Sequence, residues 1–331
     1  MSCRICGASR TREVARYAPY LDYACRVLDC DACGCRFVLY DASVYERLHA
    51  SPTSSYRAHE ELAARCAERL EAGDLPGLRR LLSRSAKFRF VLDALADRPE
   101  LSRLLEVGCS RGSLSSWFLG AGREILGVDL SPHAVAAAAA RFGDHFAAAD
   151  SPRVEAGAPY DAIFHVGTIG CVEHPIELTE RLLSLLRPGG VLLFNAPDAQ
   201  RCRRLGEPWV AGTAPPDLVT LFDADFWPRQ FAAAADVSVR FAAVDDVTRL
   251  ALAARELLGL RQLRQGRRRL LESGRSGAGR GGFPGRRLGA LGRRGLARLL
   301  RVGRVRTALI SRVPEYRAEF GMLVTIRRKD G

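Results

Sequence analysis

The stretch from Leu104 to Gly112 reads LLEVGCSRG and decides the fold class that the sequence predicts. A short apolar run predicts a buried strand over 104–107, and Gly108 and Gly112 bracket a tight turn before a helical segment over 113–119. A glycine turn between a strand and a helix lets the backbone approach a ligand closely and points helix amide groups at it. We therefore expect an α/β domain that binds a ligand at this turn.

A second strand is predicted over 124–129, and it ends in Asp129, which follows Glu106 by 23 residues. Ser131 and Pro132 then provide an N-cap and a first-turn proline for an alanine-rich helix. A carboxylate at the end of the second strand can accept hydrogen bonds from both ribose hydroxyls of a nucleoside. The order of strand, glycine turn, helix, strand and acid therefore predicts a nucleoside ligand.

The glycine turn also indicates which nucleoside is bound. A dinucleotide-binding turn has the pattern G-x-G-x-x-G, whereas this turn has Ser110 and Ser113 at the second and third glycine positions. The strand before the turn ends with Glu106, a carboxylate that is poorly placed beside a pyrophosphate and suits a cationic ligand. S-adenosylmethionine is such a ligand, because it carries an ammonium and a sulfonium and no phosphate.

Over roughly residues 85–245 and the last strand, the chain resembles the class I S-adenosylmethionine-dependent methyltransferases. The resemblance rests on four motifs in the same order as in that family. They are LLEVGCSRG at 104–112, GVDLSP at 127–132, YDAIFHV at 160–166 leading to EHP at 173–175, and LRPGGVLLF at 186–194. Ser110 is the main departure, because the family usually has glycine there.

The resemblance implies a Rossmann-like sheet with helices on both faces and S-adenosyl-L-methionine as the cofactor. It implies that Glu106 acts near the methionine moiety, that Gly108 and Gly112 shape the loop, and that Asp129 holds the ribose. The implied cofactor set is completed by Cys109, Leu130 and Asp150, with Asp150 beside the adenine. The alternative is that the three acidic residues are only solvated strand ends.

Six of the ten cysteines lie in the first 35 residues, and four of them have the spacing of a zinc ribbon. Cys3 and Cys6 form one C-x-x-C pair, and Cys30 and Cys33 form another 23 residues later. Each pair can present two sulfurs to one tetrahedral ion, so we expect a structural Zn²⁺ with no open position for catalysis. Two alternatives remain, one with Cys35 in place of Cys33 and one with reduced cysteines that bind no metal.

Methyl transfer to oxygen or nitrogen can require a base, and two histidines follow the predicted fourth strand of the domain. His174 and His165 are the candidates, because neutral imidazole can remove a proton near pH 7. His174 could instead be a structural part of its Glu-His pair, and His165 could be a packed strand residue. Cys109 and Cys171 are not expected to act as nucleophiles, because neither has a base partner in the sequence pattern.

The chain divides into five predicted segments. They are a zinc ribbon over 1–40, a helical linker or cover over 41–100, the cofactor-binding core over 101–245, an Arg/Gly-rich helical insertion over 246–315, and a last core strand with a tail over 316–331. In the cover, Tyr45, Tyr56 and His59 could face a ligand. An aromatic connection over 207–231 could either form a wall of the acceptor site or pack one helix onto the sheet through Phe226, Trp227 and Phe231.

The net charge of +13 comes from one segment, since residues 255–312 hold seventeen Arg and two acids. This segment could neutralise RNA phosphates, although it has few aromatic residues for base stacking. We expect methylation of a small metabolite that is natural-product-like or saccharide-like, and an anionic metabolite is one option. The alternatives are an RNA-modifying methyltransferase and a noncatalytic S-adenosylmethionine-binding protein. The sequence has no membrane span or signal peptide pattern, so a cytoplasmic protein in a biosynthetic role is expected.

Overall fold

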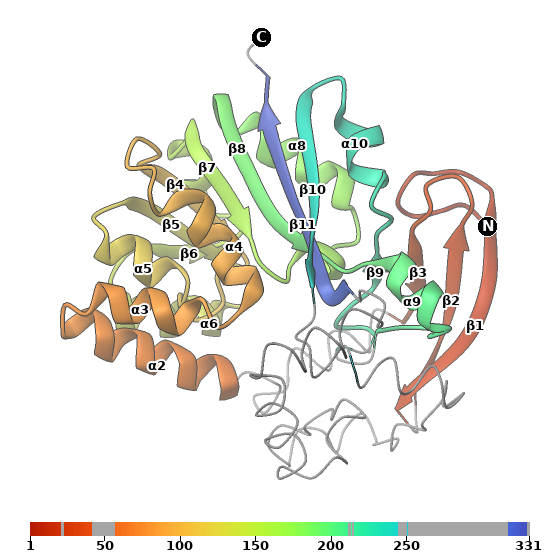
Figure 1. Cartoon of the computed structure of the whole chain (residues 1–331), viewed down its shortest axis with the longest axis horizontal. Coiled ribbons are helices and arrows are strands. Elements are labelled where there is room, and N and C mark those ends of the chain that lie inside the picture. Colours follow the sequence, from red (N-terminus) through yellow and green to blue (C-terminus); the bar gives the residue numbers. More distant parts are fainter. Residues whose placement is uncertain are drawn as a thin grey trace, which may run out of the picture.

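The computed structural model describes residues 1–20, 23–41, 57–210, 213, 215–243, 250 and 317–329. These residues form a seven-stranded sheet and a four-stranded sheet (Figure 1). The predicted insertion over 246–315 lies outside the described residues except for residue 250, and so do Tyr45 and Tyr56.

The seven-stranded sheet has the order β10-β11-β8-β7-β4-β5-β6. Its strands are β4 (Arg103–Val107), β5 (Glu124–Asp129), β6 (Phe146–Ala148), β7 (Tyr160–His165), β8 (Leu186–Ala196), β10 (Ala235–Ala243) and β11 (Arg317–Arg328). Strands β6, β5, β4, β7 and β8 pair in parallel, and β11 pairs antiparallel to both β8 and β10. The predicted Rossmann-like sheet is confirmed, and the predicted last strand is β11.

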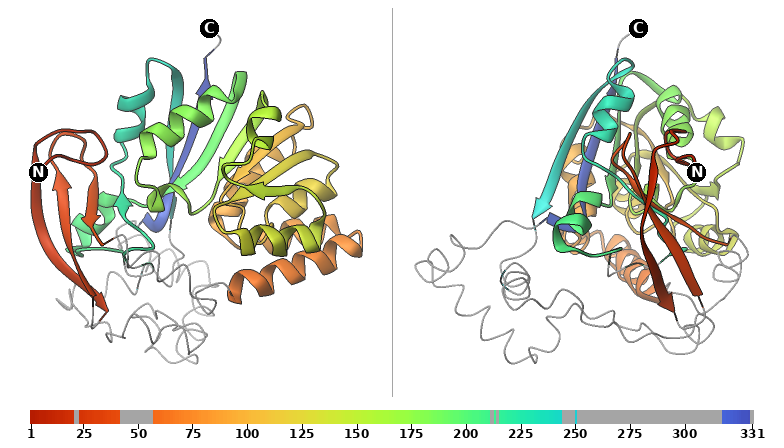
Figure 2. Two further views of the ribbon diagram at one scale, coloured as in Figure 1. Left: turned by 180° about the vertical axis from the view of Figure 1, so that it is seen from behind. Right: turned by 90° about the vertical axis from the view of Figure 1, so that its right-hand side faces the viewer.

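Helices cover both faces of this sheet (Figure 2). One face carries α2 (Arg57–Glu71), α3 (Leu75–Leu82), α4 (Ala86–Leu95), α5 (Ser115–Gly120) and α6 (Pro132–Phe142), and the other carries α8 (Pro175–Ser184) and α10 (Phe226–Phe231). The shorter elements are α7 (Arg153–Ala156), the 3₁₀ helix η1 (Ile169–Cys171) and α9 (Ala199–Leu205). None of the helices in the described ranges is long and apolar enough to cross a bilayer.

The central strands are buried on both faces, which explains their continuous apolar runs. Successive side chains of a strand point to opposite faces. Accordingly, Leu105 and Leu192 belong to the core under α8 and α10, whereas their neighbours Leu104 and Leu193 belong to the core under α3 to α6. The parallel pairing brings the carboxyl ends of β4, β5 and β7 to one edge of the sheet, where the predicted cofactor residues lie.

The amino-terminal sheet contains β1 (Thr11–Tyr20), β2 (Tyr23–Cys30), β3 (Arg36–Leu39) and β9 (Thr220–Leu221). The first three strands form an antiparallel meander, and β9 pairs with β3 through Phe37 and Thr220. The predicted ribbon therefore shares its sheet with the connection that follows β8. Sequence analysis did not anticipate this pairing.

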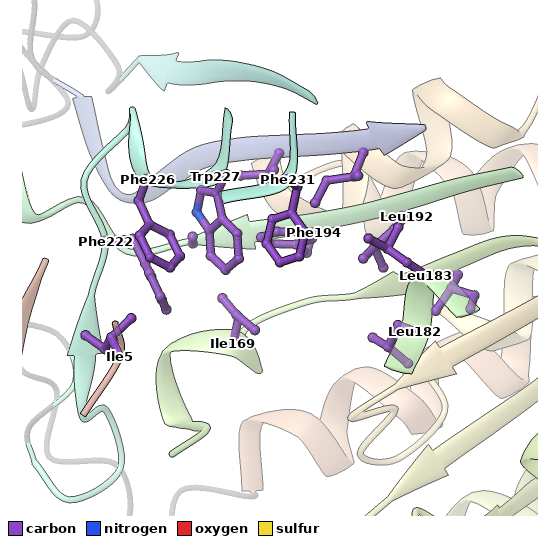
Figure 3. Packing of buried hydrophobic residues seen from close by; sticks show 14 of the residues in the cluster. Ile5, Ile169, Leu182, Leu183, Leu192, Phe194, Phe222, Phe226, Trp227 and Phe231 are labelled. Carbon is purple, nitrogen blue, oxygen red and sulfur yellow. The ribbon is translucent and has the colours of Figure 1, made fainter. Parts of the chain in front are cut away.

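Trp227 is the centre of an aromatic core beneath α10 (Figure 3). It is fully buried, and its ring lies 4.8 Å from those of Phe194 and Phe222, measured between centroids. Phe226 and Phe231 pack against the same ring. Of the two interpretations of this aromatic segment, the packing of a helix onto the sheet is therefore the one observed.

We predict that Trp227→Ala lowers the free energy of unfolding by about 3–5 kcal/mol, because the substitution leaves a large cavity in a close-packed core. The matched control is Leu130→Ala, since the Leu130 side chain is 82% exposed and its truncation is expected to change stability by less than about 0.5 kcal/mol. Denaturant unfolding followed by fluorescence and circular dichroism measures both variants. Equal stabilities for the two variants would contradict this account of the core.

Candidate functional site

The turns that follow β4 and β7 touch each other at the carboxyl edge of the sheet. Gly108 has a φ of +75°, and a Cβ atom at this position would lie 2.3 Å from Thr168 Oγ1. The Thr168 hydroxyl donates a hydrogen bond of 3.2 Å to the Val107 carbonyl. Only glycine fits at position 108, both for its backbone conformation and for the space available.

The carboxylate of Asp129 links the turn after β4 to the start of α6. Its Oδ2 accepts a hydrogen bond of 2.8 Å from the Ser110 amide, and its Oδ1 accepts one of 2.9 Å from the Ser131 amide. A carboxylate oxygen has two lone-pair sites, so each oxygen can still accept a ligand hydroxyl. Ser110 is the one non-glycine residue with a positive φ, +50°, in the described part of the chain, at the position where the motif usually has glycine.

Glu106 is enclosed at the end of β4 and is 3% exposed. The Ser115 hydroxyl donates a hydrogen bond to its Oε2. Burial raises the pKa of the Glu106 carboxyl to about 8. A buried carboxyl group of this kind gains an interaction when a cation reaches it, so the edge of the sheet suits a ligand that carries an ammonium.

The remaining predicted cofactor residues differ in what they offer a ligand. Gly112 has a φ of +73°, and a Cβ atom there would lie 2.7 Å from the Phe146 ring. Leu130 and Asp150 are exposed, beyond the ends of β5 and β6. Cys109 is 4% exposed and belongs to the core behind the turn, and its amide donates to the Val128 carbonyl. Its thiol is thus directed into the protein interior.

Helix α2 holds the turn from the outside, which sequence reasoning missed. Glu60 forms ion pairs with Arg111, at 3.3 Å, and with Arg141, at 2.6 Å. The His59 ring lies 3.2 Å from the Ser110 hydroxyl, between Nδ1 and Oγ. No local sequence pattern identifies these contacts, because they join residues 51 to 81 positions apart in the chain.

The two candidate histidines have opposite surroundings. His165 is fully buried, lies 4.6 Å from the Phe194 ring between centroids, and has no hydrogen-bond partner on either ring nitrogen in the described structure. Burial lowers its pKa to about 3. The His165 ring is thus a packed strand side chain without solvent contact, as in the second interpretation of this residue. His174 precedes α8 with a side chain that is 64% exposed, and its Nδ1 lies 3.6 Å from Glu177 Oε1.

The structure brings the four predicted zinc ligands together. The sulfurs of Cys3, Cys6, Cys30 and Cys33 all lie within 4.8 Å of one another, with 3.9 Å between Cys3 and Cys33 and 3.7 Å between Cys6 and Cys30. A tetrahedral Zn²⁺ with Zn–S bonds of about 2.3 Å places its sulfurs about 3.8 Å apart. The donor set therefore fits zinc. Cys35 lies outside this cluster, and its thiol contacts the Cys33 carbonyl.

The two zinc knuckles have matching backbone geometry. The Gly7 amide donates a hydrogen bond of 2.8 Å to the Cys3 carbonyl, and the Gly34 amide donates one of 2.9 Å to the Cys30 carbonyl. Both glycines have φ near the left-handed region, at +74° and +75°. The turn after each C-x-x-C pair thus needs glycine, as the sequence indicated.

Buried charges join the ribbon to the connection after β8. Arg36 and Asp29 form an ion pair at 2.7 Å inside the ribbon, and Arg203 of α9 contacts Asp29 at 3.2 Å. Arg203 also donates a hydrogen bond to the Gly34 carbonyl, next to the second zinc knuckle. These contacts connect the second cysteine pair directly to α9.

The edge just described defines a class of protein. A glycine turn after the first parallel strand, a buried glutamate before it and an oriented acid after the second strand are the features of a class I S-adenosylmethionine-dependent methyltransferase domain. Residues 78–235 match the family model described as "Methyltransferase domain". The match and the strand order together identify residues 78–235 as a methyltransferase domain of this class.

Individual proteins are similar to parts of the chain. The malonyl-[acyl-carrier protein] O-methyltransferase of Enterobacter lignolyticus (strain SCF1) is 29% identical over 158 residues, which cover 47% of this chain and 54% of that protein. The match thus spans about half the length of this curated relative. The plantazolicin methyltransferase BpumL in complex with SAH has a TM-score of 0.40 at 12% identity, covering 87% of this chain and 97% of its own. A SAM dependent methyltransferase from Archaeoglobus fulgidus also has a TM-score of 0.40 at 12% identity, covering 73% and 94%.

We predict that purified protein contains one Zn²⁺ per chain and that Cys30→Ser loses this metal and melts at a lower temperature. The reason is that metal binding stabilises a folded knuckle which also contacts α9. Metal content by mass spectrometry and melting by differential scanning calorimetry measure the two effects.

Cys25→Ala is the matched control for the zinc prediction. Cys25 is a buried thiol of the same ribbon, and its sulfur donates to the Tyr17 carbonyl instead of joining the cluster. This variant should keep its zinc. A Cys30→Ser protein that retains full zinc occupancy would show that the ligand set is wrong.

Proposed function

We propose that the protein transfers a methyl group from S-adenosyl-L-methionine to an O, N or C atom of a small-molecule acceptor. The observation that carries this proposal is the oriented Asp129 carboxylate beside the glycine turn, with the enclosed Glu106 carboxyl one strand away. This pair suits a ligand that has a ribose at one end and an ammonium at the other. The match of residues 78–235 to a methyltransferase domain also supports methyl transfer as the reaction.

Each predicted residue at the carboxyl edge of the sheet would contact a different part of the cofactor. Asp129 would bind the ribose hydroxyls, and Glu106 would attract the ammonium of the methionine moiety. The exposed Leu130 side chain and Asp150 would flank the adenine, since they follow β5 and the adjacent β6. The bound cofactor supplies a methyl group that its sulfonium has already activated.

The protein's own contribution is placement and proton removal. Holding the acceptor atom in line with the methyl group supplies much of the barrier reduction. When the acceptor is a hydroxyl or an amine, we propose that His174 removes the proton, because its ring is exposed and it follows the turn after β7. Glu177 lies close enough to orient that ring.

The proposed acceptor class is based on one relative and on the composition of one segment of the chain. The malonyl-[acyl-carrier protein] O-methyltransferase takes a malonyl group carried on a protein as its acceptor, as its name states, and this similarity supports an acyl or related metabolite acceptor for the present chain. A natural-product-like or saccharide-like molecule is our preferred acceptor. The RNA alternative rests on the Arg-rich residues 255–312, which lie outside the described residues.

An acceptor screen tests the proposed function. Zinc-loaded protein and S-adenosylmethionine are mixed with small hydroxyl, amine, carboxyl and activated-carbon acceptors and, separately, with total RNA, and formation of S-adenosylhomocysteine is followed. Turnover with at least one small acceptor and none with RNA is expected. Turnover with RNA alone would favour the RNA-modifying alternative, and a protein that binds S-adenosylmethionine without any turnover would favour a noncatalytic role.

We predict that binding of S-adenosylhomocysteine releases a proton from Glu106. The pKa of this carboxyl is raised to about 8 by burial, so it is protonated in the free protein at pH 7, whereas a ligand ammonium favours the ionised form. Affinity should therefore rise with pH between about 6 and 8, by up to about tenfold per pH unit. Calorimetry in buffers of different ionisation enthalpy measures the released proton.

Glu106→Gln is the control for this linkage, because it keeps the shape of the side chain and removes the titration. The variant should bind more weakly and with an affinity that no longer depends on pH in this range. A wild-type affinity that is constant from pH 6 to 8 would contradict the role of Glu106.

We predict that His174→Gln lowers kcat by about 10²–10⁴-fold with a hydroxyl or amine acceptor, because general base catalysis contributes about that factor. The dissociation constant of S-adenosylhomocysteine should be unchanged. His145→Gln, which alters another exposed histidine, is the matched control and should keep full activity. An unchanged kcat in His174→Gln would assign proton removal to another group.

A further inference from the structure

Lys87 places an ammonium beside the turn that follows β7, close to the predicted cofactor residues. It belongs to the first turn of α4 and is one of two lysines among 50 basic residues. A Cβ atom on Gly167 would lie 3.2 Å from Lys87 Nζ. Gly167 precedes Thr168, whose hydroxyl occupies the space beside Gly108. The ammonium, the turn after β7 and the glycine turn are therefore contiguous.

This is an unfavourable place for a cation without a partner. The first turn of a helix carries a positive partial charge, and the first turn of α4 has no acidic residue to offset it. Lys87 is half-buried, and burial lowers the pKa of its amine. Within the described ranges of the chain, no ion pair or hydrogen bond of this ammonium is found. By contrast, Lys329 Nζ donates a hydrogen bond of 2.7 Å to the Ala232 carbonyl.

Among the described residues, the titratable groups that interact with Lys87 are Cys171 and His59, and neither supplies a negative charge. Burial raises the pKa of the Cys171 thiol to about 12, so this thiol is neutral at pH 7. His59 is the other neighbour, and burial followed by the positive charge of Lys87 lowers its pKa. The described part of the chain therefore leaves the Lys87 ammonium without a counter-charge, and a ligand anion is the partner proposed below.

We propose that Lys87 binds a carboxylate beside the turn after β7 and the glycine turn. The inference rests on the proposed function, since methyl transfer offers two sources of a carboxylate, the methionine moiety of the cofactor and the acceptor. A compact ammonium with three N–H donors binds one carboxylate well. A dianionic phosphate fits less well, because the Asp129 carboxylate lies at the same edge of the sheet and repels a doubly charged anion more strongly than a singly charged one.

Calorimetry with two nucleosides distinguishes the two sources. S-adenosylhomocysteine carries the amino-acid carboxylate, whereas 5′-methylthioadenosine lacks it. If the cofactor supplies the carboxylate, Lys87→Met lowers the affinity for S-adenosylhomocysteine about 10- to 100-fold and leaves the affinity for 5′-methylthioadenosine unchanged. Lys87→Arg should retain most of the affinity, and Lys329→Met, which changes the other lysine, should bind both nucleosides as the wild type does.

If the acceptor supplies the carboxylate, Lys87→Met binds both nucleosides normally, and a second measurement decides. Reductive ¹³C-methylation labels the two lysines and the amino terminus, and the Lys87 signal is assigned by its absence in Lys87→Arg. Titration of the labelled protein, saturated with S-adenosylhomocysteine, with acetate and malonate should shift the Lys87 signal and leave the Lys329 signal in place.

The proposal is overturned if Lys87→Met binds both nucleosides normally and neither acetate nor malonate shifts the Lys87 signal. Thermal melting of each variant shows that a loss of affinity does not come from unfolding. A folded wild-type protein that binds neither nucleoside would contradict the proposed function instead, and the NMR titration of the free protein would still decide the role of Lys87.

Discussion

The hydrogen bonds that the Asp129 carboxylate accepts from Ser110 and Ser131 are the interaction on which the site depends. Ser110 has a left-handed backbone conformation that costs a non-glycine residue about 1–3 kcal/mol. The bond from its amide to Asp129 offsets this cost. The same hydrogen bond fixes the position of the glycine turn relative to β5. It therefore determines both the conformation of the turn and the orientation of the Asp129 carboxylate.

The ribbon contacts the methyltransferase domain through strand pairing and hydrogen bonds. Strand β9 joins the ribbon sheet. Just before β9, the Val219 amide donates a hydrogen bond of 2.9 Å to the Gly170 carbonyl of η1. Tyr40, after β3, donates a hydrogen bond to Glu173 in the Glu-His-Pro motif. The zinc knuckles thus stabilise a sheet whose far edge contacts the turn after β7. We infer that the ribbon is a structural part of the site and not an independent appendage.

Features with a local cause were predictable from the sequence. The β4 turn, the cap of α6 by Ser131 and the cysteine pairs each depend on residues a few positions apart, and all are present in the structure. Features that join distant segments were not predictable, among them the pairing of β9 with β3 and the ion pairs of Glu60. His165 was ambiguous because a parallel strand is buried on both faces, so alternation does not tell an inward side chain from an exposed one.

The central claim is that Asp129 orients and binds a nucleoside cofactor at the edge of the sheet, and titration calorimetry of the zinc-loaded protein with S-adenosylhomocysteine tests it most directly. We predict saturable binding by the wild-type protein and binding at least about 100-fold weaker by Asp129→Ala, because two charge-assisted hydrogen bonds to the ribose are lost. Absence of binding by folded wild-type protein, or equal affinities of the two proteins, would contradict the account.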